Sequence, residues 1–196
     1  MIGWVWTASA ADPAPSAAVF EESVLPDISV GFERTIEQDI GFGIRQQTDI
    51  ACKALSAAIN DPYTAIQAIE HLTVLYAALA AHPPGEITGR AQGCVVAIPT
   101  RSFAEHLSLG VGLIRRYGAA EPTVVAALLR LLTATVGAGG HADEQRAVVI
   151  EQADLLVAAA ERAVAEPADL VLVRSARAAL DLAPPPAATP GRPADH

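Results

Sequence analysis

The sequence predicts a mostly α-helical single domain, a bundle of about six helices with at most a small two-stranded β element. Three observations favour this fold class. Hydrophobic residues make up 52% of the chain and aromatic residues only 5%, with alanine dominant, which suits closely packed helices. Apolar residues recur at helical spacing in several segments. Capping boxes and first-turn prolines mark helix starts.

These signals predict three regions along the chain. Residues 1–18 are rich in alanine, proline and serine and are expected to be a flexible N-terminal segment. Residues 19–182 form the predicted helical domain. Residues 183–196 are rich in proline and alanine, and we expect a disordered tail there.

The first predicted helix starts at Thr35 and ends near Ala57. Thr35 and Gln38 have the spacing of a capping box. Gly41 and Gly43 lie inside this helix at a cost of roughly 1 kcal/mol each relative to alanine, which indicates close backbone packing or a bend. The apolar face expected to meet the core consists of Ile36, Ile40, Ile44, Ala51, Ala54 and Leu55.

The second helix is predicted over Pro62–Ala81, with Asp61 as N-cap and proline at the first helical position. Cys94–Ile98 is a short apolar run that predicts a buried strand, and Ile28–Phe32 is a candidate partner because its apolar residues alternate. A second capping box, Ser102 with Glu105, opens a helix that reaches Tyr117.

Three more helices complete the predicted bundle. One runs from Pro122 to Gly137, and the longest runs from Asp143 to about Ala165. The last is expected to start at Pro167 and to end near Leu182.

The stretch Glu33–Thr64 resembles a known family. Its pattern ERTxxQDxxFGIRQ, followed by DIAxKALS, xINDP and TA, is similar to the signature of a bacterial family catalogued as domain of unknown function 2254. Members of this family are described as predicted membrane proteins. Gln47-Thr48 replaces an apolar pair of the family pattern, and Ala57 replaces a proline. The resemblance implies a membrane-embedded half or partner protein and a place at the cytoplasmic face of the cell membrane.

The composition of the chain restricts the classes of partner and the cellular setting that we expect. The formal charge of -9 argues against a nucleic-acid partner, which would require clustered lysine and arginine. Charges are expected to interrupt every apolar run before it reaches the ~18 residues of a membrane span. Cys52 and Cys94 are too few for a disulfide framework or a zinc site, and a reducing, intracellular setting fits them.

No catalytic residue, metal site or cofactor is predicted, because nucleophile and phosphate-loop motifs are missing from the sequence. The candidate site is instead a set of polar side chains around the first helix. They are expected to form a network, which either fixes the fold or faces a ligand or neighbouring subunit. Its members are Arg34, Gln38, Asp39, Arg45, Gln46, Asp49, Asn60 and Asp61.

Two functions follow as hypotheses. The first is a soluble, cytoplasmic, non-enzymatic helical module of a membrane protein, which acts in assembly or regulation. Its partner is then the rest of a membrane protein or, alternatively, a second copy of the chain. The second hypothesis is a small-molecule-binding or hydrolytic domain that uses the cluster Arg34, Asp39, Arg45 and Asp49.

Overall fold

The computed structural model describes residues 4–7, 39–82, 87–91, 94–98, 100–138 and 143–182. In these residues the chain forms six helices and a small sheet, so the predicted mostly α bundle is confirmed. The first capping box, the candidate strand Ile28–Phe32 and the expected tail lie outside the described residues. The helices are α2 (Ile40–Ala54), α3 (Pro62–Ala81), α4 (Phe103–Gly118), α5 (Pro122–Ala138), α6 (Asp143–Ala163) and α7 (Leu170–Asp181).

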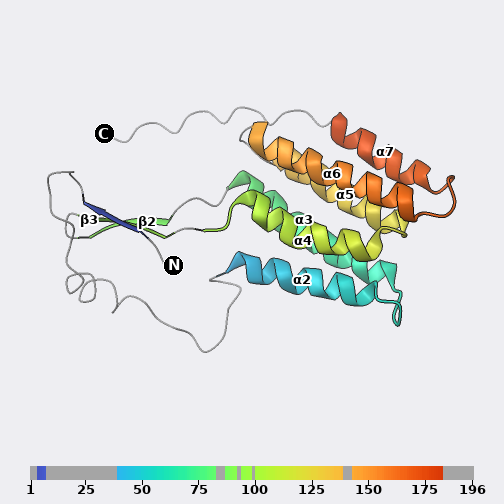
Figure 1. The fold of residues 1–196 in the computed structure, drawn as a ribbon, viewed down its shortest axis with the longest axis horizontal. Helices are drawn as coiled ribbons and strands as arrows, with labels where there is room; N and C mark the ends of the chain where they lie inside the picture. Colours follow the sequence, from blue (N-terminus) through green and yellow to red (C-terminus); the bar gives the residue numbers. More distant parts are fainter. Residues whose placement is uncertain are drawn as a thin grey trace.

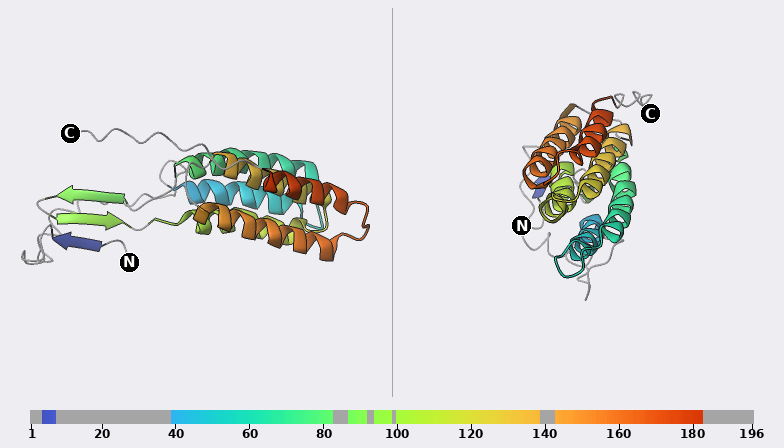
Figure 2. Two further views of the ribbon diagram at one scale, coloured as in Figure 1. Left: turned by 90° about the horizontal axis from the view of Figure 1, so that it is seen from above. Right: turned by 90° about the vertical axis from the view of Figure 1, so that its right-hand side faces the viewer.

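The six helices form three antiparallel hairpins, α2–α3, α4–α5 and α6–α7, which stack side by side (Figure 1). The stack has two layers, with α2, α4 and α6 in one and α3, α5 and α7 in the other (Figure 2). Helix α5 packs against α3 and α7 within its layer and against α4 and α6 across the layers. The helix α7 therefore lies at one edge of the stack and α2 at the other.

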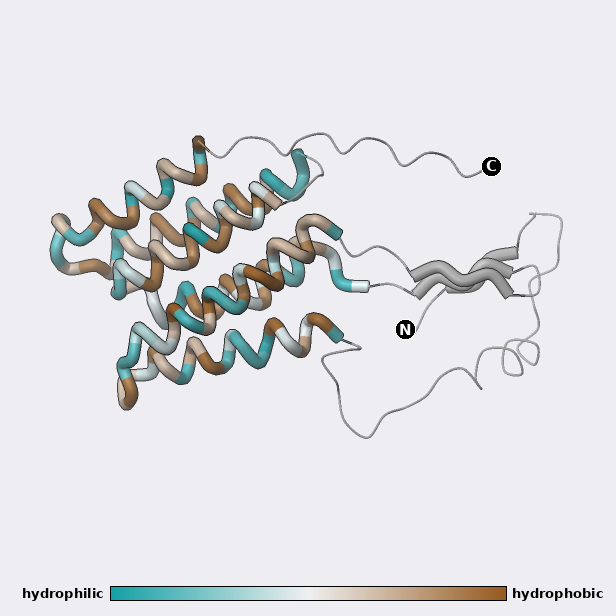
Figure 3. Tube along the Cα trace, turned by 180° about the vertical axis from the view of Figure 1, so that it is seen from behind, coloured by the Kyte–Doolittle hydropathy of each residue, from teal (hydrophilic) through white to brown (hydrophobic). Residues whose placement is uncertain are grey.

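The core runs between the two layers. Helix α5 is buried on nearly every side, as expected of a helix with four neighbours, and Leu128, Leu129, Leu131 and Leu132 are fully buried. The outer helices are amphipathic, and hydrophobic and hydrophilic residues alternate along them (Figure 3). The predicted apolar face of the first helix is confirmed where it is described, because Ile44, Ala51 and Ala54 are buried.

Local signals explain where two helices begin. The Ser102 hydroxyl accepts a hydrogen bond from the Glu105 backbone N–H at 3.2 Å, and the Glu105 carboxylate accepts one from the Ser102 backbone N–H at 2.7 Å. This reciprocal pair is the predicted capping box at the start of α4. The Asp61 carboxylate caps α3 by accepting from the Thr64 backbone N–H at 3.1 Å.

Other helix boundaries differ from the prediction. Helix α2 begins at Ile40 rather than Thr35, because Asp39 has the extended backbone of an N-cap, with φ -141° and ψ 96°. It ends at Ala54 rather than near Ala57. Helix α7 begins at Leu170 rather than Pro167, since a turn follows the proline.

The β element has three strands, not the two at most that the sequence predicted. Strand β3 (Cys94–Ile98) is the predicted strand, and it lies between β1 (Trp4–Thr7) and β2 (Ile87–Ala91). Both pairings are antiparallel. Both edges of β3 are thus taken by strands other than the candidate Ile28–Phe32, and β1 falls in the segment expected to be flexible. Sequence patterns did not place β2, which is short and partly polar, and they did not reveal that β1 pairs with the distant β3.

A tyrosine from α3 reaches α4 through a gap left by a glycine. The buried Tyr76 hydroxyl donates a hydrogen bond to the His106 carbonyl at 2.6 Å. A Cβ atom at Gly110 would lie 2.3 Å from the Tyr76 hydroxyl oxygen and 3.1 Å from its ring carbon Cζ. Gly110 therefore makes the close approach of the Tyr76 side chain to α4 possible.

We predict that Gly110→Ala destabilises the protein by about 1–3 kcal/mol, because the added methyl group overpacks a buried contact. The matched control is Gly112→Ala in the same helix, where the nearest atom to the new Cβ would be the Ser108 hydroxyl oxygen at 3.8 Å. That substitution is expected to be neutral or stabilising by up to about 1 kcal/mol. Urea unfolding measures both, and equal effects would contradict the role given to Gly110.

Candidate functional site

A buried histidine lies where the N-termini of α2 and α4 meet. Only 4% of His106 is exposed. A Cβ atom at Gly41 would lie 3.4 Å from the imidazole Cε1, 3.6 Å from Nδ1 and 3.0 Å from the Asp39 carboxylate oxygen Oδ1. Gly41 thus lets the imidazole and the carboxylate both lie against the first turn of α2. This is the close backbone packing that a glycine inside the predicted helix indicated.

The electrostatics favour a neutral imidazole. Burial, together with the positive charge of Arg101, lowers the pKa of His106 below its ordinary value of 6.5, while Asp39 and Glu105 act in the opposite direction. Within the described part of the chain, His106 Nδ1 is buried and has no hydrogen-bond partner. A buried nitrogen without a partner costs about 1–3 kcal/mol, so this site opposes stability while the tyrosine bond supports it.

Two potential nucleophiles lie on or beside the same two helices, Ser102 at the N-cap of α4 and Cys52 within α2. The Ser102 hydroxyl lies 2.9 Å from the Glu105 carboxylate and belongs to the helix cap. Burial, then the charge of Asp49, raises the pKa of Cys52 to about 11, so its thiol stays protonated at neutral pH. Among the residues with described side chains, no three His, Cys, Asp or Glu converge as metal ligands.

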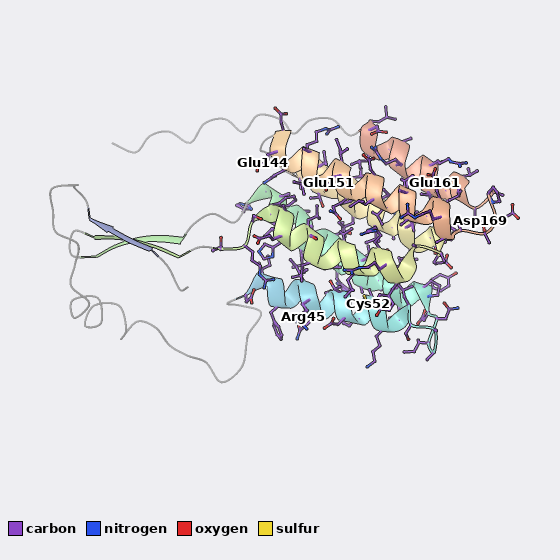
Figure 4. All side chains as sticks on the ribbon, in the orientation of Figure 1. Arg45, Cys52, Glu144, Glu151, Glu161 and Asp169 are labelled. Carbon is purple, nitrogen blue, oxygen red and sulfur yellow. The ribbon has the colours of Figure 1, made fainter. Side chains whose placement is uncertain are left out.

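The predicted Arg45–Asp49 pair forms, but on the surface. Arg45 Nε lies 3.8 Å from Asp49 Oδ2, and the two side chains are 66% and 63% exposed. Gln46 beside them is also exposed. Figure 4 shows Arg45 on the outer side of α2, away from the other helices.

Asn60 and Asp61 serve the turn between α2 and α3. Asn60 adopts a left-handed backbone with φ 47°, which asparagine tolerates better than most residues. The Asp61 carboxylate also accepts a hydrogen bond from the Thr64 hydroxyl at 2.6 Å. The side-chain bond to Thr64, then its backbone N–H, lowers the pKa of Asp61.

The described members of the predicted set therefore lie at separate places. Asp39 precedes the N-terminus of α2, Arg45 and Asp49 lie along its exposed side, and Asp61 follows its C-terminal turn. Arg34 and Gln38 are outside the described residues. The structure brings Asp39 together with His106, which sequence reasoning missed. The sequence did carry one signal for His106: it lies at helical spacing among the apolar residues Phe103, Leu107, Val111 and Ile114, which are buried in the structure.

Fold and site together define a mostly α protein of stacked helical hairpins, in which a buried hydrogen bond from Tyr76 joins α3 to α4. The chain belongs to the family described as predicted membrane protein (DUF2254), which matches residues 1–134. Similar proteins are the uncharacterized proteins Mb1321c of Mycobacterium bovis and Rv1290c of Mycobacterium tuberculosis, both 42% identical over 95% of this chain. The chain spans 37% of the length of these relatives. No solved structure matches it.

Helix α3 bears on the expectation that charges interrupt every apolar run before it reaches the length of a membrane span. It is long and apolar enough to cross a membrane by length and composition, since Glu70 is its sole Asp, Glu, Lys or Arg residue. In the structure, α3 packs against α2 and α5 and carries the Tyr76 contact. A core helix passes the same test of length and composition, so this is weak evidence for a span.

We predict that His106 makes the protein less stable as the pH falls from 7 to about 5.5. The folded state lowers the pKa of this group below 6.5, so the unfolded state binds more protons in that window. The stability contribution is complete above pH 6.5 and is lost as the pH falls toward the folded-state pKa. Urea unfolding at several pH values measures it.

His106→Leu should flatten this pH dependence, whereas the same change at the exposed His71 of α3 should leave it intact. Carboxylates such as Asp61, with a lowered pKa, affect stability mainly below about pH 5, outside the window. An unchanged pH dependence in His106→Leu would contradict the prediction.

We predict that Asp49→Ala costs less than about 1 kcal/mol, as expected of an exposed ion pair. A buried network would instead lose about 3–5 kcal/mol when one charged partner is removed. A urea melt of this variant separates the two ranges. A loss in the higher range would show that Asp49 has buried partners.

Proposed function

We propose that this chain is a cytoplasmic helical module of a membrane protein, with a role in assembly or regulation and no reaction of its own. The supporting observation is that the polar contacts described above serve the fold. The buried Tyr76 hydroxyl joins α3 to α4 through the His106 carbonyl, and the more exposed side chains of Asp61 and Ser102 cap helices. Of the groups that sequence alone suggested for chemistry, Arg45 and Asp49 lie on the exposed side of α2.

Two further observations support the proposal. The family is one of predicted membrane proteins, and the chain corresponds to 37% of the length of its relatives. A module of this size could contact the rest of such a protein or another copy of itself. The free thiol of Cys52 fits a reducing compartment such as the cytoplasm.

The rival hypothesis, a small-molecule or hydrolytic site around Arg45 and Asp49, is tested by ligand-induced stabilisation. The purified chain and its Asp49→Ala variant are heated with a panel of metabolites and divalent cations. We expect no compound to raise the melting temperature of the parent chain more than that of the variant. A rise that Asp49→Ala abolishes would overturn the proposal in favour of the rival.

A further inference from the structure

The imidazole of His106 lies between one helix start that is firmly held and one that is not. Helices α2 and α4 begin at the same end of the stack (Figure 1). On the α4 side, the capping box of Ser102 and Glu105 holds the first turn. The Tyr76 hydroxyl bonds the His106 carbonyl on the same side. On the α2 side, the Asp39 side chain makes no capping bond to the helix, so this is the side that opens more easily.

The first turn of α2 contributes little burial of its own. We call residues Ile40–Gly43 the α2 entry turn. Two of its four residues are glycines, which lose much backbone entropy in a helix and have no side chain to bury. Ile40 and Phe42 are only partly buried, and the first fully buried large side chain of the helix is Ile44, directly after the turn. The entry turn can therefore open while Ile44 keeps the rest of α2 packed.

The entry turn covers the imidazole. A Cβ atom at Gly41 would lie 3.4 Å from Cε1 and 3.6 Å from Nδ1 of His106, so the ring lies directly beside the backbone of this turn. Only 4% of His106 is exposed. Within the described residues, Nδ1 is buried and has no hydrogen-bond partner. The turn thus separates an unpaired ring nitrogen from water.

A proton on this ring changes what the turn encloses. The charged imidazole has two N–H donors, and burying a charged donor without an acceptor is costly. In the described part of the chain, the charges that act on the ring are Arg101, which opposes the proton, and Asp39 and Glu105, which favour it. From α3 only the neutral hydroxyl of Tyr76 reaches this residue, at its backbone carbonyl, and no described ionisable group of α5 or α6 acts on the ring. Burial and Arg101 outweigh the two carboxylates, so the closed turn favours the neutral ring.

We propose that the α2 entry turn is a pH-sensitive switch, closed over the neutral imidazole of His106 and open when that ring is protonated. In the open form the ring reaches water and recovers its ordinary pKa of 6.5, whereas the closed form has a lower pKa. The open form therefore binds more protons, and the preference for the closed form is complete above pH 6.5 and lost as the pH falls toward the lower pKa. The first acid-induced change is then confined to one helix end, while the rest of the stack stays folded.

Amide hydrogen exchange of the full chain, followed by NMR, tests the inference. The reporter is the Phe42 N–H, which donates to the Asp39 carbonyl at 2.9 Å within the entry turn. After correction for the intrinsic exchange rate, we expect its protection to fall several-fold, and by at most about tenfold, between about pH 7.5 and 5.5. Its exchange should not depend on urea below the unfolding transition, because a local opening exposes little surface.

The control amide in the same protein is the Ala65 N–H, which bonds the Asp61 carbonyl at 3.3 Å in the first turn of α3. That turn lies at the opposite end of the stack from His106 (Figure 1), so the urea-independent part of its exchange should keep the same protection. Among variants, His106→Leu should abolish the pH dependence at Phe42. The matched control His71→Leu removes an exposed histidine of α3 and should retain it.

Four results would overturn the inference. Protection at Phe42 that is constant with pH, or a pH dependence that His106→Leu retains, would show that the turn does not respond to this ring. A fall that depends on urea and matches that of Leu129 in the core would show global unfolding. A rise in acid would show that the protonated ring pairs with Asp39 and holds the turn closed. If His106→Leu does not fold, the wild-type protein still decides. The proposed function fails separately, through Asp49-dependent stabilisation by a ligand.

Discussion

The hydrogen bond between the Tyr76 hydroxyl and the His106 carbonyl constrains the first two hairpins of the stack. It is buried, it crosses from one layer to the other, and it exists because Gly110 has no side chain. The consequences spread to the N-terminus of α2, since the same histidine lies against Gly41 and near Asp39. One tyrosine, one histidine and two glycines thus link three helices. A neutral imidazole is the form that tolerates this burial, as its lowered pKa reflects.

The elements that could be predicted from the sequence are those with local signals. Asp61 and Pro62 mark the start of α3, and Ser102 with Glu105 marks the start of α4, because each signal acts within one helical turn. The strand Cys94–Ile98 was recognisable from its apolar run, but its partners were not. Pairing between strands depends on contacts far apart in sequence, which no local pattern encodes.

The candidate site shows the same limit. Arg45 and Asp49 were predicted to belong to a polar network because charged residues are dense in that stretch. A spacing of one helical turn, however, is compatible with an exposed ion pair as well as with a buried one. The sequence around His106 contains none of the residues that contact it. Gly41 and Asp39 lie near its imidazole from the start of α2, and Tyr76 of α3 bonds its carbonyl. Burial, not composition, identifies it, and burial becomes visible only when the helices are packed.

The position of the sheet has a consequence for how this protein can vary. Strands β2 and β3 occupy the connection between α3 and α4, at the junction between the first hairpin and the second. An acidic residue and a proline stand at or just before the start of the second helix in all three hairpins, at Asp61-Pro62, Glu121-Pro122 and Glu166-Pro167. The hairpins thus resemble modular units, and the strands occupy a joint between two of them. Since lengthening a loop costs little entropy, this joint is a natural insertion point, where evolution or an engineer could exchange one appendage for another without repacking the helices.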